Sequence, residues 1–276
     1  MKKIISFIFS LSAFMCIVLP GTALAGRSCD VKKTSPQSFE RGLALAIKTL
    51  AALNASSDKV VILARAGQDL SKYGLQYSHL GFAYRLPDEE GGSTWRVLHK
   101  LNECGTSTSA IYRQGLGEFF LDDLWRFEAV WVAPSPEVQA RLFSAIQNPS
   151  ASLQMHHKPY SMVSYAWSTK YQQSNQWAIE TLAAAMEPSI TQTNQHITDT
   201  RSKAQAWLQF KGYQPTPLRI DALTRLGGRI SSANIAFDDH PSAKRFSDRI
   251  ETVTVDSVFE WMKRANLCVK PMTLIQ

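Results

Sequence analysis

Two short stretches decide the fold, Tyr77-Ser78-His79-Leu80-Gly81-Phe82 and Tyr171-Gln172-Gln173-Ser174-Asn175-Gln176-Trp177. The first is a histidine at the head of an apolar strand, and the second is a polar turn that opens a helix predicted over residues 174–186. A base at the head of a strand that faces a nucleophile at a helix N-terminus is a hydrolase or acyl-transfer geometry. The remaining chain is therefore predicted to be the scaffold that brings these stretches together.

Residues 1–25 have the pattern of a secretory signal peptide. Lys2 and Lys3 precede the apolar run Ile4 to Leu19, and Ala23-Leu24-Ala25 offers a small-residue cleavage site. The run is short for a bilayer span and no stop-transfer charges follow it, so we expect no integral membrane span after processing. The sequence thus predicts an exported, periplasmic protein of a Gram-negative bacterium, with one domain over residues 26–276.

The charge balance is mildly basic. The formal net charge of +7 falls to +5 when the two lysines of the signal peptide are removed. Because the sequence has no dense Lys/Arg run and no basic stripe interleaved with aromatic residues, we expect no nucleic-acid partner. No cofactor is expected either.

Three cysteines remain after processing, Cys29, Cys104 and Cys268. An oxidising compartment allows one disulfide and one free thiol. The sequence does not fix the pairing. Cys29 with Cys104 is preferred, because an N-terminal segment needs to be tied down and Cys104 follows a predicted strand.

Hydrophobic periodicity predicts an α+β domain with an antiparallel sheet and helices packed on it. The predicted helices cover residues 39–50, 117–124, 137–147, 174–186, 204–210, 219–226 and 255–264, and the predicted strands cover 59–64, 77–84, 95–101, 109–113, 127–132 and 235–237. We expect Gly227-Gly228 to break the sixth helix.

His79 and Ser174 are the candidate base and nucleophile. A histidine at a strand edge can present one ring nitrogen to a substrate while the other is held, and Gly81 lets another backbone or a ligand approach closely. A serine hydroxyl would need that histidine to remove its proton. Each residue also has a structural alternative: His79 as a hydrogen-bonded structural histidine, and Ser174 as a helix N-cap.

Other polar residues could complete such a site. His99 lies on the next predicted strand and could orient the imidazole, as could an acid from Asp238-Asp239, beside His240. The amides of Gln172, Asn175 and Gln176, with the backbone N–H groups of Ser174 and Asn175, could be oxyanion donors or could only satisfy the helix end. Arg65 could pair with a carboxylate or bind an anionic substrate. Asp239 and His240 lack further spaced ligands, so no metal site is expected.

Five motifs make the chain resemble the bacterial family DUF2145 over nearly its whole mature length: residues 65–70, 77–81, 171–177, 237–241 and 252–258. That family looks like a circularly permuted, NlpC-type papain-like fold, in which a histidine strand precedes a helix with a cysteine nucleophile at its N-terminus. Relatives tend to read Tyr-Gln-Asn-Cys-Asn-Gln-Trp at the second stretch, whereas Gln173-Ser174 stand here in place of Asn-Cys. By position, the resemblance implies His79 as the base and Ser174 in the place of the nucleophile.

Two functions follow as hypotheses. The first is an exported hydrolase or acyltransferase of amide or ester bonds, for which the resemblance implies peptidoglycan peptides or lipid-linked acyl groups as substrates. The second is a non-catalytic binding protein on the same scaffold, with a cleft that holds a cell-envelope peptide, glycan or lipid. The change from cysteine to serine weighs the two nearly equally.

Overall fold

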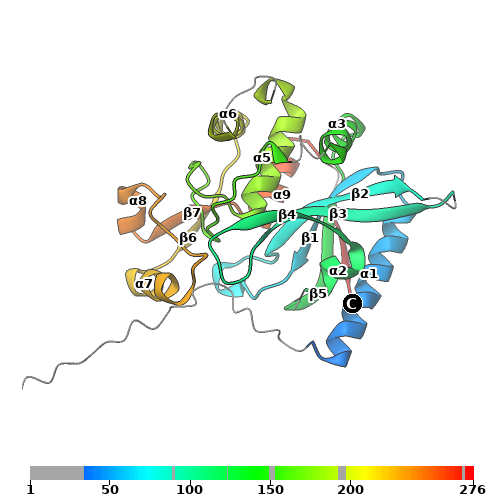
Figure 1. The fold of residues 1–276 in the computed structure, drawn as a ribbon, viewed down its shortest axis with the longest axis horizontal. Coiled ribbons are helices and arrows are strands. Elements are labelled where there is room, and N and C mark those ends of the chain that lie inside the picture. Colours follow the sequence, from blue (N-terminus) through cyan, green and yellow to red (C-terminus); the bar gives the residue numbers. More distant parts are fainter. Residues whose placement is uncertain (1–33, 89–90, 123, 149–152, 192–196, 269–270) are drawn as a thin grey trace, which may run out of the picture.

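The computed structural model describes residues 34–88, 91–122, 124–148, 153–191, 197–268 and 271–276 (Figure 1). The predicted signal peptide, residues 1–25, and Cys29 lie outside these ranges. Cys104 takes part in a disulfide and Cys268 is a free thiol. Within the described ranges, no helix combines the length and the apolar character that a bilayer span requires.

A six-stranded antiparallel sheet forms the centre of the molecule, with strand order β4-β3-β2-β1-β5-β8. Its strands are β1 (Val60–Ala66), β2 (His79–Pro87), β3 (Ser93–Asn102), β4 (Ser109–Gly115), β5 (Arg126–Val132) and β8 (Met272–Ile275). The predicted strands in this region are confirmed to within a few residues, and β8 was not predicted. The fold is therefore α+β, as predicted.

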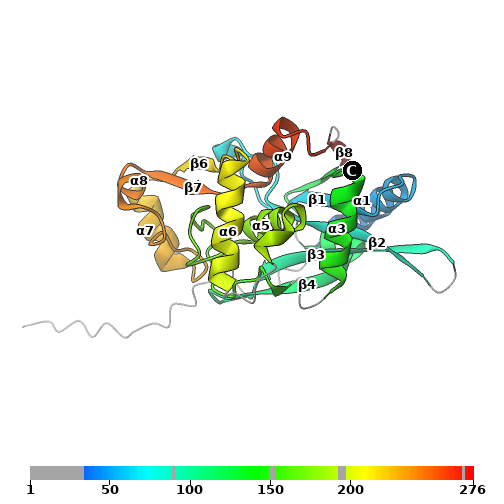
Figure 2. The ribbon, with the colours of Figure 1, turned by 90° about the horizontal axis from the view of Figure 1, so that it is seen from above.

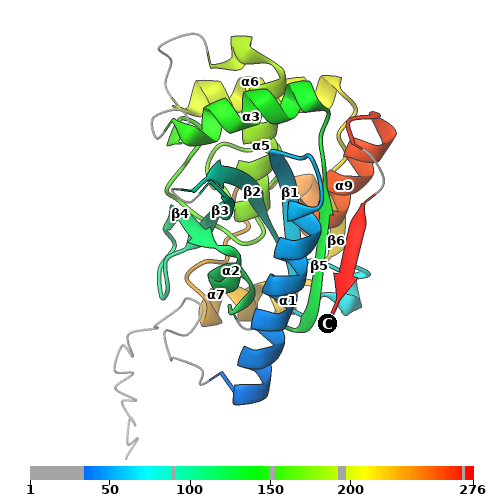
Figure 3. The same cartoon turned by 90° about the vertical axis from the view of Figure 1, so that its right-hand side faces the viewer.

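Helices cover both faces of this sheet (Figures 2 and 3). On one face α3 (Pro136–Gln147) and α5 (Ser174–Met186) pack directly, α6 (Ile197–Phe210) packs on α5, and α9 (Val255–Arg264) joins the same apolar cluster. The other packs against α1 (Pro36–Asn54) and α2 (Leu116–Phe120). Alternation along β2 serves both layers, since Leu80 and Phe82 join the α5 side while Ala83 joins the α1 and α2 side.

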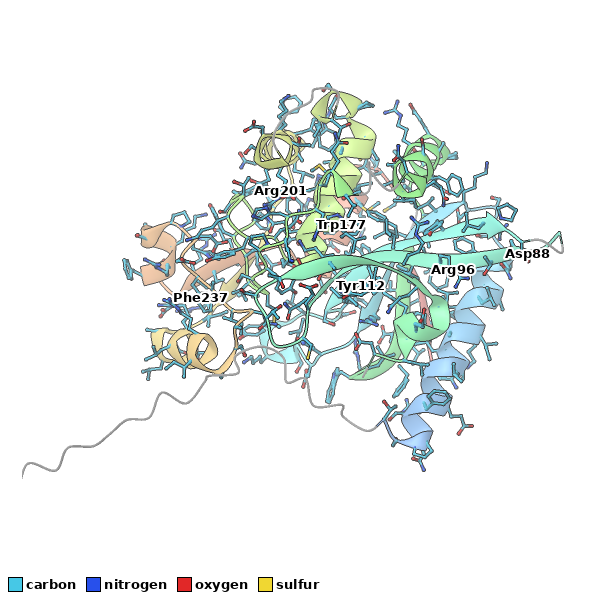
Figure 4. All side chains as sticks on the ribbon, in the orientation of Figure 1. Asp88, Arg96, Tyr112, Trp177, Arg201 and Phe237 are labelled. Carbon is cyan, nitrogen blue, oxygen red and sulfur yellow. The ribbon has the colours of Figure 1, made fainter. Side chains whose placement is uncertain are left out.

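Helix α5 crosses the sheet and packs on β2 and β3. It is buried along nearly its whole length, and Trp177 contacts Phe82 with ring centroids 5.6 Å apart (Figure 4). The predicted helix 174–186 has these same bounds. This burial fixes where the N-terminus of α5 meets the sheet.

A small lobe lies at the end of the molecule opposite α1 (Figures 1 and 2). It comprises the two-stranded sheet of β6 (Thr216–Arg219) and β7 (Arg249–Thr252), with α7 (Ala222–Ser231) and α8 (Ser242–Phe246). Two predictions here are wrong: Gly227-Gly228 do not break α7, and residues 235–237 form no strand. Phe237 instead packs as a buried side chain in an apolar cluster with Leu218 and Ile250 (Figure 4).

Candidate active site

The N-terminus of α5 bonds to β2 where the backbone pairing of β2 with β3 ends. Pairing between these strands runs only as far as Phe82 with Leu98, so the described part of β3 offers no partner to residues 79–81. Asn175 takes its place: its Oδ1 accepts from the N–H of Leu80 at 3.1 Å, and its Nδ2 donates to the carbonyl of Ser78 at 3.3 Å. The residue after Ser174 is thus bonded to both neighbours of His79.

The turn before α5 is attached to the neighbouring strand β3. Lys100 of β3 is fully buried and donates to Gln172 Oε1 at 2.7 Å. Gln172 Nε2 donates to the carbonyl of Met155 at 2.8 Å and to Glu180 Oε2 at 2.6 Å. Because both ends of its amide are engaged, Gln172 holds the turn in position and is no oxyanion donor.

A buried ion pair between α5 and α6 holds the same turn. Glu180 of α5 and Arg201 of α6 are both fully buried, with Nε and Oε2 2.8 Å apart (Figure 4). Arg201 also donates to the backbone carbonyls of Ser168, Thr169 and Tyr171. The turn that presents Ser174 is therefore rigidly held. The pair was not predicted from the sequence, although a glutamate within an otherwise apolar helix is a signal of such a partner.

Ser174 is the first residue of α5 but not its N-cap. Gln173 is the cap, since its Oε1 accepts from the N–H of Asn175 at 3.0 Å. That bond also removes the Asn175 N–H from the predicted oxyanion donors. The Ser174 hydroxyl is therefore not used as the cap. Burial raises the pKa of Tyr160, an effect that the Ser174 hydroxyl opposes.

Two histidines and a glutamine form a hydrogen-bonded chain across β2, β3 and β4. His79 Nε2 lies 2.8 Å from His99 Nδ1, and His99 Nε2 lies 2.8 Å from Gln114 Oε1. Since a glutamine oxygen only accepts, His99 donates through Nε2 and accepts from His79 Nε2 through Nδ1. In this arrangement His79 Nδ1 carries a lone pair. The sequence analysis named His99 as an orienting residue but not Gln114.

Burial and a neighbouring cation keep both rings neutral. Burial, the positive charge of Arg65 and the adjacent His99 hold the pKa of His79 well below its ordinary value. Burial and Arg65 lower the pKa of His99 to about 4, opposed by the hydrogen bond to Gln114. Arg65 itself forms an ion pair with Asp122, and its guanidinium lies 4.6 Å from the centroid of the Phe119 ring.

Gly81 allows the two histidine strands to approach. A Cβ atom at this position would lie 2.8 Å from the Cβ of His99 and 3.0 Å from the carbonyl oxygen of Leu98. Any side chain here would push β3 away. Glycine two residues after His79 is thus a requirement of the His79–His99 contact.

Several of the other predicted residues lie elsewhere. Asp239 accepts from the N–H of Tyr165 at 2.8 Å and contacts His240 Nδ1 at 3.0 Å, and neither side chain reaches the cavity beside His79. Asp238 pairs with Lys170 at 2.7 Å. His99, rather than either acid, is therefore the group in contact with His79.

The amide of Gln176 is also committed away from the site. Its Oε1 accepts from Ser164 at 2.7 Å, and its Nε2 donates to the carbonyls of Tyr165 and Ala166, each at 3.3 Å. Within the described ranges, no group of three or more histidine, cysteine or acidic side chains is arranged to hold a metal ion.

His79 and Ser174 both line one large cavity of about 1120 Å³ between the sheet and the small lobe. Arg65, Gln114, Tyr160 and Asn175 share its polar end. The far end is apolar, with walls from the lobe and the loops beside it: Tyr73, Leu75, Met162, Val163, Leu218, Ile220, Ile235 and Phe237. Among the described residues, no direct hydrogen bond joins His79 to Ser174. The structure brings the two side chains to the lining of one cavity.

Comparison with known proteins gives one family. Residues 52–262 match the model of DUF2145, described as an uncharacterized protein conserved in bacteria. No curated protein and no solved structure matches the chain. The matched segment runs from the end of α1 through α9 and includes the histidine chain, the turn before α5 and the small lobe. The chain therefore belongs to the DUF2145 family.

Proposed function

We propose that this protein is a hydrolase or acyltransferase of amide or ester bonds, with Ser174 as the nucleophile and His79 as its base. The observation that carries the proposal is the pair of hydrogen bonds from Asn175 to Ser78 and Leu80, which join the residue after Ser174 to both neighbours of His79, whose Nε2 is already engaged. The resemblance to permuted NlpC-type proteins supports a cell-envelope peptide, glycan or acyl lipid as the substrate, encountered in the periplasm.

The proposed chemistry has two steps. Ser174 Oγ attacks the carbonyl carbon as its proton passes to His79 Nδ1, and His79 then protonates the departing amine or alcohol. Water or an acceptor hydroxyl releases the acyl group from Ser174 by the reverse sequence. The N–H of Ser174, at the first turn of α5, is a donor for the developing oxyanion.

The electrostatics set a condition on this chemistry. His79 is neutral at pH 7 and can accept a proton, but burial and Arg65 both disfavour the imidazolium that results. The negative charge that develops on the substrate oxygen must offset that penalty. We therefore expect slow turnover unless bound substrate brings His79 and Ser174 within hydrogen-bond distance of each other.

A second candidate is a binding protein that uses the same cavity without chemistry. The observation that favours it is that His79 and Ser174 line a cavity with many apolar side chains while no direct hydrogen bond joins them within the described part of the chain. In that case the apolar end of the cavity would hold an acyl chain or apolar peptide side chains, and the polar end would bind the head of the ligand.

A serine-directed fluorophosphonate probe separates the two candidates. For the enzyme, the probe labels the wild type, Ser174→Ala abolishes labelling, and His79→Ala reduces it by on the order of tenfold or more. Ser78→Ala is the matched control, because Ser78 lines the same cavity but accepts from the N–H of Gly67 at 2.9 Å. Labelling that survives Ser174→Ala would contradict the assignment of the nucleophile.

A thiol at the same position gives an independent measurement. A helix N-terminus and a nearby base both favour a thiolate, so Ser174→Cys should react with iodoacetamide at pH 7 on the order of tenfold faster than Ser78→Cys. Cys268 is an internal reference, since burial raises the pKa of that thiol. If the probe fails and Ser174→Cys reacts no faster than Ser78→Cys, the binding protein replaces the enzyme as the conclusion.

A further inference from the structure

Helix α7 exposes its apolar side chains and buries a charged one. Leu223, Leu226 and Ile230 are 80%, 56% and 65% exposed, and spacings of three and four residues place them on one face. The opposite face holds Arg225, which is buried and bonded to the carbonyl of Ile220 and to Asp248 Oδ1. The orientation of the helix is fixed by these bonds, so the apolar face points away from the protein.

Three exposed cations lie on or beside α7: Arg229 on the helix itself, and Lys72 and Arg219 beside its first turn. Lys72, Arg219 and Arg229 are exposed, and no carboxylate of the described residues forms an ion pair with any of them. Lys72 and Arg219 line a shallow depression beside the first turn of α7, together with Thr224. Asp221 lines the same depression and caps α7, accepting from the N–H of Thr224 at 2.9 Å. Hydrogen bonds from Thr224 lower the pKa of this carboxyl, so its negative charge offsets part of the positive charge beside α7.

We infer that α7 is a docking helix for an anionic lipid surface. An amphipathic helix with leucine and isoleucine on one side and arginine beside it lies in the membrane interface with its apolar face among the acyl chains. The three unpaired cations fit an anionic surface and disfavour a basic or neutral one. Thr224 and Gly228, on the side of α7 that faces the protein, line the large cavity, so docking would place a wall of that cavity directly behind the lipid-bound helix. This inference does not depend on the chemistry proposed for Ser174.

Hydrogen–deuterium exchange on the full chain tests the docking directly, because it localises binding to a helix. With vesicles of phosphatidylcholine and phosphatidylglycerol in a 3:1 ratio, amides of residues 222–231 should become protected by on the order of tenfold. Pure phosphatidylcholine vesicles or 0.5 M NaCl should remove most of this protection, since both weaken the electrostatic attraction. Absence of protection in α7 with the anionic vesicles would overturn the inference.

Vesicle co-sedimentation of matched triple variants provides the second arm. Leu223→Ser/Leu226→Ser/Ile230→Ser should weaken binding to the anionic vesicles by on the order of tenfold or more. The control is Phe39→Ser/Ile47→Ser/Leu50→Ser on α1, which also exposes three apolar side chains, 48%, 66% and 36% exposed. Equal binding by the two triple variants would overturn the inference. Concentration-dependent self-association lost only in the α7 variant, without vesicle binding by the wild type, would assign the face to a second copy of this chain instead.

Discussion

Helices α5 and α7 place the same kinds of residue in opposite ways. In α5 the apolar side chains are buried against the sheet and the one acid, Glu180, is buried with them and paired. In α7 the buried residue is Arg225, and Leu223 and Leu226 face outward. The difference teaches that an apolar pattern predicts a helix but not what covers it. The buried helix α5 positions the candidate site, whereas α7 presents an exposed apolar face.

The largest expected effect is the loss of the α5 ion pair. Glu180→Gln should lower the free energy of unfolding by about 3–5 kcal/mol, because it leaves Arg201 as an uncompensated buried charge. The matched change in the lobe, Asp248→Asn, should lower it by about 1 kcal/mol or less, since the Asp248 side chain is 42% exposed. Urea denaturation of both variants measures the contrast. Similar values for the two would contradict the division between framework and surface.

Acidification should lower the free energy of unfolding through the neutral side chain of His99. Burial lowers the pKa of His99 to about 4, below the ordinary value of about 6.5. The unfolded chain therefore takes up protons that the folded chain refuses. The stability associated with a neutral His99 is fully present above pH 6.5 and is lost as the pH falls toward 4, by up to about 3 kcal/mol.

Urea denaturation at pH 7 and pH 5 measures this loss. His99→Gln removes the titrating group while keeping a polar side chain, so its stability should change less between the two pH values. The neighbouring His79 also has a lowered pKa and should account for part of the remaining slope. A wild-type protein that is equally stable at both pH values would show that these rings protonate without penalty.

The polar residues at the N-termini of α5 and α7 make different hydrogen bonds. Asn175→Ala removes both bonds to β2, and we expect a loss of about 2 kcal/mol with slower labelling of Ser174 by the fluorophosphonate probe. Asp221→Ala removes only the cap of α7, for which a loss of about 1 kcal/mol is expected. Denaturation and probe labelling of the two variants separate positioning from capping. If the probe labelled Asn175→Ala as fast as the wild type, the hydrogen bonds of Asn175 to β2 would not be what positions Ser174.

Much of the central framework could be predicted from periodicity. Strands β1 to β5 and helices α5 and α9 carry strong two- or 3.6-residue patterns, so their positions were confirmed closely. The short strands β6, β7 and β8 were missed because four residues carry little pattern, and each is specified by its partner strand instead.

The site could be predicted only in part. His79, His99 and Ser174 are predictable from residue type and position. The structure places His79 and Ser174 in the lining of one cavity and bonds His99 to His79. Gln114 was not found, because its role depends on the register of β4 against β3, which pairs it with Val97. The acids of the 238–239 turn were misplaced because sequence cannot show which way a turn faces.

The smallest expected effect tests why α7 passes through two glycines. Glycine in an exposed helix interior is less favourable than alanine by about 1 kcal/mol, and a Cβ atom at Gly227 would meet no atom within 4 Å. Gly227→Ala should therefore slow amide exchange in α7 without vesicles and leave the cavity unchanged. Gly228→Ala is the matched variant, since its Cβ would contact Ile235 at 3.5 Å and reduce the volume of the cavity. If Gly227→Ala left amide exchange in α7 unchanged, the glycines would not be what lowers the stability of this helix in solution. Any added protection of α7 on binding lipid would then come from the exposed apolar face alone.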